Sequence, residues 1–249
     1  MLGVIGGSGL TQLANLEITH RLVVRTPYGD PSGPLAFGNI NGQELAFVPR
    51  HGYGHTIPPH LVNYRANIWA LHEQGVRDIV SVATVGGISS ELQPGSIVIP
   101  NQIIDYTWGR KSTFFEEATD KPVTHVDFTE PYTHVLRQLC IRAVAATGES
   151  FVDGGVYATM QGPRLETAAE INRLERDGAT IVGMTGMPEA VLARELSMNY
   201  AAICVVANHA AGRASSSNGI RYQDIESVLS EAMGKVRAVL EKLVTLHGR

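Results

Sequence analysis

Residues 78–85 read Asp-Ile-Val-Ser-Val-Ala-Thr-Val, a run rich in β-branched residues that is typical of a strand. Similar short runs recur along the chain, at 2–6, 45–49, 96–100, 152–160, 179–184 and 201–207. Several of them are apolar throughout instead of alternating between apolar and polar residues, which is typical of a sheet covered on both faces. We therefore expect a central, mostly parallel sheet that is buried between helices.

Helical patterns separate these runs. The spacing of apolar residues predicts helices over 60–74, 132–147, 165–177, 187–196 and 222–246. The last of these has one apolar stripe, formed by Ile225, Val228, Leu229, Met233, Val236, Val239, Leu240 and Leu243. Residues 105–130 carry little helical signal, which indicates a long irregular excursion, and loops of that length are often functional. Strands that alternate with helices, without an internal repeat, predict one α/β domain over 1–249.

The composition is that of an ordinary globular protein, with 249 residues, 44% hydrophobic and 18% charged, and a formal net charge of −4. No basic excess points to nucleic acid, and no long apolar run or basic amphipathic face points to a membrane. The N-terminus lacks the features of a signal peptide, so we expect a cytoplasmic protein. Cys140 and Cys204 lie in apolar runs and are expected to be buried thiols.

A glycine-rich turn, Gly6-Gly7-Ser8-Gly9, follows the first expected strand. Backbone N–H groups and the Ser8 hydroxyl are able to hold an anion there. A dinucleotide fingerprint needs a glycine where this chain has Gln12, and a Walker loop needs a Gly-Lys-Ser/Thr string that the chain lacks. A tight turn without a ligand is the alternative.

Two further strands end in residues suited to an oxyanion. Arg50-His51 follows the run 45–49, and Thr84, after Ala83, lies at the end of the run 78–85. Ligands of open α/β sheets gather at this carboxyl edge. Arg offers two N–H donors to an oxyanion and His a third. A solvated Arg and a flexible turn are the alternatives. The neighbouring histidines show no zinc spacing, so no metal site is expected.

Two polar residues are suited to recognising a heterocyclic base. Glu166 lies in Gln-Gly-Pro-Arg-Leu-Glu-Thr (161–167), which is expected to open a helix, where the macrodipole favours a carboxylate. Asn208 follows the apolar run 201–207, and its amide both donates and accepts hydrogen bonds. The alternatives are a helix-start carboxylate without a ligand and an ordinary turn residue.

Taken in this order, the strings resemble those of the trimeric purine nucleoside phosphorylases, and in particular their 5′-methylthioadenosine phosphorylase branch. Further strings carry the resemblance: Asn-Tyr-Arg-Ala-Asn-Ile-Trp-Ala-Leu (63–71), Leu-Gln-Pro-Gly (92–95), and Met184-Thr185 followed by Pro188-Glu189. The likeness runs from Gly6 to the final helix. It implies a nucleoside phosphorylase-like α/β fold, a nucleoside and inorganic phosphate as substrates, a homotrimer, and neither a metal nor an organic cofactor.

Carried over residue by residue, the resemblance implies a phosphate site made of Ser8, Arg50, His51, Ala83, Thr84 and Thr185. Thr84 stands where the methylthioadenosine enzymes have Ala, and Ala83 where they have Thr, so the contact of Thr84 is expected through its backbone. Met184 is expected to pack against the ribose, and Leu165 to contact the substrate. His125 matches a segment that reaches across the trimer interface toward the 5′ group of the neighbouring site.

The positions at which this chain departs from the 5′-methylthioadenosine phosphorylase branch indicate which purine base it binds. Adenine-cleaving relatives have Asp at the positions of Asn208 and Ala210, whereas Glu166 and Asn208 match the pair with which inosine- and guanosine-cleaving relatives hold purines. Ionised Glu166 accepts from N1–H of a 6-oxopurine, and the Asn208 amide donates to O6 and N7. Adenine reverses the donor and acceptor at N1 and at the 6-substituent, a mismatch of about 1–3 kcal/mol per unpaired group. A 6-oxopurine is therefore expected.

The 5′ side is expected in the stretch 218–222, where Ile220 or Tyr222 is suited to wall a methylthio group and no His occurs. A site suited to a 6-oxopurine, in a chain that resembles the 5′-methylthioadenosine phosphorylase branch, points to 5′-methylthioinosine as the substrate. Adenine-specific methylthioadenosine phosphorolysis and inosine or guanosine phosphorolysis are the alternatives within the family. Outside it, the alternatives are a nucleoside hydrolase and a nucleotide-binding module without turnover.

Phosphorolysis is the expected reaction, with His51, Glu166 and Asn208 as the catalytic residues. Phosphate approaches C1′ as the glycosidic bond lengthens, and the sugar gains oxocarbenium character. Asn208 then stabilises the negative charge that grows on the departing purine.

Overall fold

The computed structural model describes residues 1–116 and 124–248. Its framework is an eleven-stranded sheet. The strands are β1 (Leu2–Gly6), β2 (Glu17–Leu22), β3 (Leu35–Ile40), β4 (Gln43–Pro49), β5 (Asp78–Gly87), β6 (Ile97–Ile99), β7 (Gln102–Asp105), β8 (Phe151–Asp153), β9 (Val156–Thr159), β10 (Ile181–Gly183) and β11 (Asn199–His209). The helices are α1 (Tyr64–Glu73), α2 (His134–Ala145), α3 (Ala168–Arg176), α4 (Gly186–Glu195) and α5 (Tyr222–His247), with short 3₁₀ turns at Pro59–Leu61 and Ala214–Ser216.

Strand β5 is the centre of the sheet. It lies parallel to both β1 and β11, with Asp78 opposite Leu2 on one side and Asn199 on the other. Its last residues, Gly86 and Gly87, pair with β10 in the antiparallel sense. The main path runs β2-β3-β4-β1-β5-β10-β9-β7, and β11 leads on to β6 and β8. The expected α/β fold, with a mostly parallel mixed sheet flanked by helices, is confirmed. That 1–249 is one domain stays a prediction.

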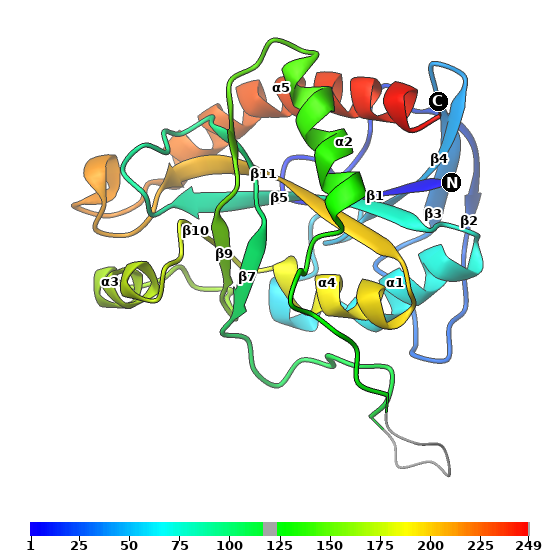
Figure 1. Ribbon diagram of the computed structural model, residues 1–249, viewed down its shortest axis with the longest axis horizontal. Coiled ribbons are helices and arrows are strands. Elements are labelled where there is room, and N and C mark those ends of the chain that lie inside the picture. Colours follow the sequence, from blue (N-terminus) through cyan, green and yellow to red (C-terminus); the bar gives the residue numbers. More distant parts are fainter. Residues whose placement is uncertain (117–123, 249) are drawn as a thin grey trace.

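Helices cover both faces of the sheet, with α2 and α5 on one side and α1 and α4 on the other (Figure 1). Val80 and Val82 of β5 are buried in the α2–α5 layer, whereas Ile79 and Ala83 are buried in the α1–α4 layer. Both faces of β5 are therefore apolar. This double burial explains why the run 78–85 does not alternate.

The long helix α5 has 26 residues and uses only part of its length for the core. Met233, Val236, Val239 and Leu240 of its apolar stripe are buried against the sheet, whereas residues 222–231 are half-buried or exposed. The first turns of α5 are thereby free to border the cavity described below. Among the described residues, no helix is long and apolar enough to cross a membrane.

Some elements differ from the expected ones. The sequence pattern does not predict β2, β3 or β7, and every residue of β2 is exposed, so this strand carries no burial signal. The run 152–160 is divided into β8 and β9 by Gly154 and Gly155, whose φ angles are 106° and 124°. The irregular excursion is confirmed for residues 106–116 and 124–130, which form neither helix nor strand, and its remainder lies outside the described residues.

Candidate active site

A cavity of about 540 Å³ opens where the carboxyl ends of β1, β4, β5, β10 and β11 meet. Most of the residues predicted for the site line it: Ser8, Arg50, His51, Thr84, Leu165, Glu166, Met184, Thr185, Asn208, Ile220 and Tyr222. These residues come from distant parts of the chain. Those that follow β1, β4, β5 and β11 meet because these parallel strands present their carboxyl ends at one edge, and β10, antiparallel to the end of β5, brings Met184 and Thr185 to the same place.

Two predicted residues do not line this cavity. The Ala83 side chain is 2% exposed and belongs to the core on the α1–α4 side, because successive side chains of β5 point to opposite faces. His125 is exposed on the irregular segment and is not a lining residue. Its expected contact with a neighbouring subunit stays a prediction.

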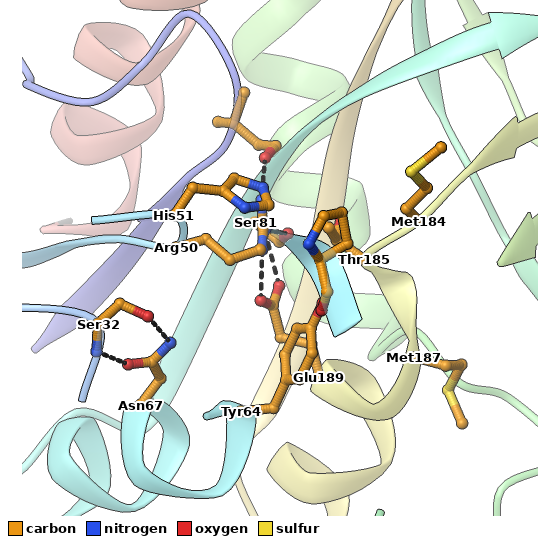
Figure 2. A network of polar contacts seen from close by, with 12 residues as sticks. Ser32, Arg50, His51, Tyr64, Asn67, Ser81, Met184, Thr185, Met187 and Glu189 are labelled. Carbon is orange, nitrogen blue, oxygen red and sulfur yellow. Dashed lines mark hydrogen bonds and ion pairs between the residues drawn. The ribbon is translucent and has the colours of Figure 1, made fainter. Parts of the chain in front are cut away.

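Arg50 is fully buried, and its guanidinium is already occupied (Figure 2). Nε donates to Glu189 Oε2 over 2.7 Å and Nη2 donates to Glu189 Oε1 over 2.9 Å. Nη2 also donates to Ser81 Oγ (2.6 Å), and Nη1 donates to the Val82 carbonyl (3.0 Å). One Nη1–H is left without a partner among the described residues. The expectation that Arg50 offers a two-pronged clamp to an anion is therefore wrong for this arrangement.

Glu189 belongs to the Pro188-Glu189 motif that carries the family resemblance, but the sequence predicted no role for it. Met187 has extended backbone angles, so regular helix in α4 begins at Pro188 and places Glu189 in the first turn, where a carboxylate is favoured. Glu189 is 1% exposed and also accepts a hydrogen bond from Tyr200 Oη (2.8 Å). Burial lowers the pKa of Arg50, but the Glu189 carboxylate outweighs this effect and raises it. Arg50 thus remains charged with its charge compensated.

The glycine-rich turn packs directly against this ion pair. A Cβ atom on Gly7 would lie 2.9 Å from Arg50 Nη1 and 2.5 Å from the Val82 carbonyl oxygen, closer than side chains pack. Glycine is therefore required for the turn to approach Arg50. The next residue, Ser8, lines the cavity, and its carbonyl accepts a hydrogen bond from Thr84 Oγ1 (3.2 Å).

His51 is neutral in this environment. Burial and the neighbouring Arg50 charge lower the pKa of His51 from 6.5 to about 4. Nδ1 lies 2.8 Å from the Ile57 carbonyl, which can only accept, so Nδ1 carries the proton. Nε2 of the neutral ring is consequently a hydrogen-bond acceptor. The expectation that His51 donates to an oxyanion is corrected: it accepts unless it becomes protonated.

Glu166 lies outside α3, two residues before its first residue, instead of in its first turn. The start of α3 is closed by a capping box, in which Thr167 accepts from the Glu170 N–H and the Glu170 carboxylate accepts from the Thr167 N–H. Glu170 therefore has the helix-start role that was the alternative for Glu166. Glu166 lines the cavity instead, and burial raises its pKa.

Asn208 lies inside β11 at an irregularity of the strand, where the register with β5 shifts between Val206 and Asn208. The alternative of an ordinary turn residue is therefore wrong. Its Nδ2 donates to the His209 carbonyl over 2.7 Å. The second Nδ2–H and Oδ1 have no partner among the described residues, and the side chain lines the cavity.

Another wall of the cavity is built by Ile220, which precedes α5, and by Tyr222 and Ile225 in the first turn of α5. Tyr222 is 69% exposed, so this wall is thin. His55, which the sequence analysis did not assign, lines the same cavity, and its Nε2 lies 3.5 Å from Ser8 Oγ. The 5′ stretch has no His of its own, but the fold brings one into the cavity from the loop after β4.

Comparison with known proteins matches the phosphorylase superfamily over residues 1–245. The chain belongs to this superfamily. Among relatives, it is 51% identical over 242 residues to a probable S-methyl-5′-thioinosine phosphorylase of Pseudomonas syringae pv. tomato, covering 97% of each chain. It is 43% identical over 247 residues to a probable 6-oxopurine nucleoside phosphorylase of Thermococcus kodakarensis, covering 98% of this chain and 91% of the relative.

A similar solved structure is methylthioadenosine phosphorylase from Schistosoma mansoni in complex with adenine. Its TM-score is 0.94 at 33% identity, and the match covers 99% of this chain and 91% of the other. The resemblance of this chain to the purine nucleoside phosphorylases is thereby confirmed. Relatives named for oxopurines and for adenine both occur, so the base must be decided from the site.

Proposed function

We propose that this protein is a purine nucleoside phosphorylase that cleaves S-methyl-5′-thioinosine with inorganic phosphate. The products are hypoxanthine and 5-methylthioribose 1-phosphate. The observation that carries the proposal is that one cavity holds Glu166 and Asn208 together with Arg50, His51 and Thr185. Groups for a purine and groups for an oxyanion are therefore within reach of one nucleoside.

The purine is held by Glu166 and Asn208. Ionised Glu166 accepts from N1–H of a 6-oxopurine, and the unpartnered N–H of Asn208 donates toward O6 or N7. Glu166 has no helix-capping role, because Thr167 and Glu170 perform it, so its half-buried carboxyl is available to a ligand. The names of relatives that act on methylthioinosine and on 6-oxopurine nucleosides support the same choice of base.

The phosphate lies at the opposite end of the cavity. The Nη1–H of Arg50 that remains and the hydroxyls of Ser8 and Thr185 donate to its oxygens. Hydrogen phosphate has one O–H, which donates to Nε2 of neutral His51. His51 thereby selects which phosphate oxygen keeps the proton, and the unprotonated oxygens are left for the donors and for C1′.

Bond cleavage follows from this placement. The glycosidic C1′–N9 bond lengthens, its electron pair moves into the purine, and a phosphate oxygen forms the new bond to C1′. Met184, which lines the cavity, packs against the ribose in this proposal. Asn208 stabilises the negative charge on the purine where it develops in the transition state. This reaction requires neither a metal nor an organic cofactor.

The assembly and location of the protein are also part of the proposal. The resemblance to trimeric relatives supports a homotrimer in which His125 reaches the neighbouring 5′ group, and His125 is exposed as such a contact requires. The composition supports a cytoplasmic location. Sedimentation of the purified protein tests the trimer, and an active-site complementation assay between His125 and Asn208 variants tests the shared site.

The experiment that tests the function compares methylthioinosine, methylthioadenosine, inosine and adenosine, each with and without phosphate. We expect methylthioinosine to be preferred and sugar 1-phosphate to be the product. Free sugar formed without phosphate would identify a hydrolase, and absence of turnover with all four would leave a binding module. Preference for methylthioadenosine would refute the base assignment but not the phosphorolysis.

A further inference from the structure

The irregular segment 106–116 contacts the loops that carry cavity residues, but none of its own residues lines the cavity. Hydrogen bonds hold both ends of this segment. Tyr106 Oη donates to Asp177 Oδ2 over 2.5 Å, and Thr113 Oγ1 and the Phe114 N–H donate to the Glu195 carboxylate over 2.7 Å each. The segment is thereby fixed between the end of α3 and the end of α4, and Arg110 lies at its middle.

Arg110 joins two loops that carry site residues. Nη2 donates to the carbonyls of Met160 (3.2 Å) and Gln161 (2.8 Å), in the loop that leads to Leu165 and Glu166. Nη1 donates to the carbonyls of Met184 (2.8 Å) and Met187 (2.7 Å), in the segment that runs from the end of β10 through Thr185 to Glu189 in the first turn of α4. One guanidinium therefore binds the base-side loop (160–167) with one nitrogen and the phosphate-side loop (183–189) with the other.

The remaining contacts of Arg110 strengthen this bridge. Nε donates to Gln161 Oε1 (3.1 Å), and Nη1 lies 3.2 Å from Tyr64 Oη, with the guanidinium over the Tyr64 ring at 5.5 Å from its centroid. Within the described ranges, no carboxylate pairs with Arg110. Its charge is balanced by four backbone carbonyls, the Gln161 side-chain oxygen and the Tyr64 ring, an arrangement that requires the planar fork of Arg and that a Lys ammonium cannot reproduce.

We propose that Arg110 is a positioning residue that fixes the spacing between the base-side and phosphate-side loops. Since it does not line the cavity, it acts only through the backbone that holds Glu166, Met184 and Thr185. Fixed spacing keeps C1′ within reach of the bound phosphate while the purine is held at the other end. The inference rests on the proposed phosphorolysis and identifies a residue that this reaction needs outside the substrate contacts.

The test uses the full-length protein and the variants Arg110→Lys and Arg110→Ala, with Lys111→Gln as the control. Lys111 is the neighbouring exposed cation, and its one salt bridge within residues 1–116 and 124–248 is to Glu116, which Arg65 also binds. Initial rates over a grid of phosphate and methylthioinosine concentrations give kcat and both KM values. We expect kcat to fall about 10- to 100-fold in both Arg110 variants, the size of effect that a misplacement of about 1 Å produces. Lys111→Gln should match the wild type.

Chemical rescue separates positioning from general destabilisation. Methylguanidinium added to Arg110→Ala should restore part of kcat at a temperature well below the unfolding transition, and methylammonium should not. Wild-type kcat in a folded Arg110→Lys variant would overturn the proposal, as would a loss in Arg110→Ala that methylguanidinium leaves unchanged. If Arg110→Ala does not fold, kcat of Arg110→Lys decides alone. Wild-type protein without phosphorolytic activity would instead refute the proposed function.

Discussion

The Glu189 carboxylate holds the Arg50 guanidinium through two parallel hydrogen bonds, Oε2 to Nε at 2.7 Å and Oε1 to Nη2 at 2.9 Å, with both side chains buried. The predicted phosphate arginine is therefore pre-oriented and charge-compensated before any ligand arrives. Together with neutral His51, this makes the proposed phosphate site a set of hydrogen-bond donors and one acceptor without an uncompensated cation.

Removing this carboxylate should weaken both the fold and phosphate binding. In Glu189→Gln, the buried Arg50 charge loses its counterion, and breaking such a pair costs about 3–5 kcal/mol in the free energy of unfolding. The KM for phosphate should rise while the KM for the nucleoside changes less, because Arg50 is no longer held in one orientation. Urea unfolding and two-substrate kinetics measure the two effects.

Two tyrosines provide a matched comparison for that network. Tyr200→Phe removes the hydroxyl that donates to Glu189, and should cost about 1–3 kcal/mol because a buried acceptor loses a partner. Tyr132 stacks on Tyr200 at 6.0 Å, but its buried hydroxyl has no partner in the described part of the chain, so Tyr132→Phe should not weaken the protein. Equal losses from both substitutions would contradict a specific role for the Glu189 hydrogen bond.

Asn208→Asp should shift base preference toward 6-aminopurines. The amide that donates to O6 or N7 is replaced by an acceptor, which suits the 6-amino group of adenine. The ratio of kcat/KM for methylthioinosine to that for methylthioadenosine should fall by the equivalent of about 1–3 kcal/mol, or about 5- to 150-fold. An unchanged ratio would show that Asn208 does not read the base.

The base preference should also depend on pH. Burial raises the pKa of Glu166, so the carboxyl becomes protonated at a higher pH than an ordinary glutamate. The ionised form is the stronger acceptor for N1–H of an oxopurine, whereas only the protonated form donates to N1 of adenine. The methylthioinosine-to-methylthioadenosine ratio should therefore decrease as pH falls through this pKa. In Glu166→Gln, which cannot ionise, the ratio should no longer follow that titration.

His51 should distinguish phosphate from sulfate. Sulfate has no O–H to donate to the Nε2 acceptor, so above about pH 5 it should compete with phosphate about 5- to 150-fold more weakly. As pH falls toward about 4, His51 becomes protonated and sulfate inhibition should strengthen. Inhibition constants for sulfate across pH, with His51→Gln for comparison, measure this. A constant preference for phosphate in both proteins would exclude the acceptor role.

The same titration affects stability. The folded-state pKa of His51 is lowered below its ordinary value of 6.5, so the unfolded chain binds a proton that the folded chain refuses between pH 6.5 and about 4. Above pH 6.5 this titration should leave the free energy of unfolding unchanged. As pH falls from 6.5 to about 4, it should lower the free energy of unfolding. Denaturation of wild type and His51→Gln at several pH values isolates this contribution, and parallel curves would contradict it.

Periodicity alone was sufficient for the elements that bury a face. The continuous apolar runs of β5 and β11 and the stripe of α5 correspond to layers that pack on both sides of the sheet. It was insufficient for β2, whose side chains are all exposed and whose pairing with β3 leaves no burial pattern in the sequence. Likewise, the start of α3 is set by the capping box between Thr167 and Glu170, which gives Glu170 the role that the sequence offered to Glu166.

The sequence by itself determined the α/β class, the positions of the central strands along the chain and the residue types at their carboxyl ends, because local periodicity and strand-end position depend on short stretches of chain. Only the tertiary structure decided that Arg50 is bound by Glu189, 139 residues away, that His51 presents an acceptor, and that Arg110 bridges two site loops. These roles depend on hydrogen bonds between distant segments, and such contacts have no periodicity to read.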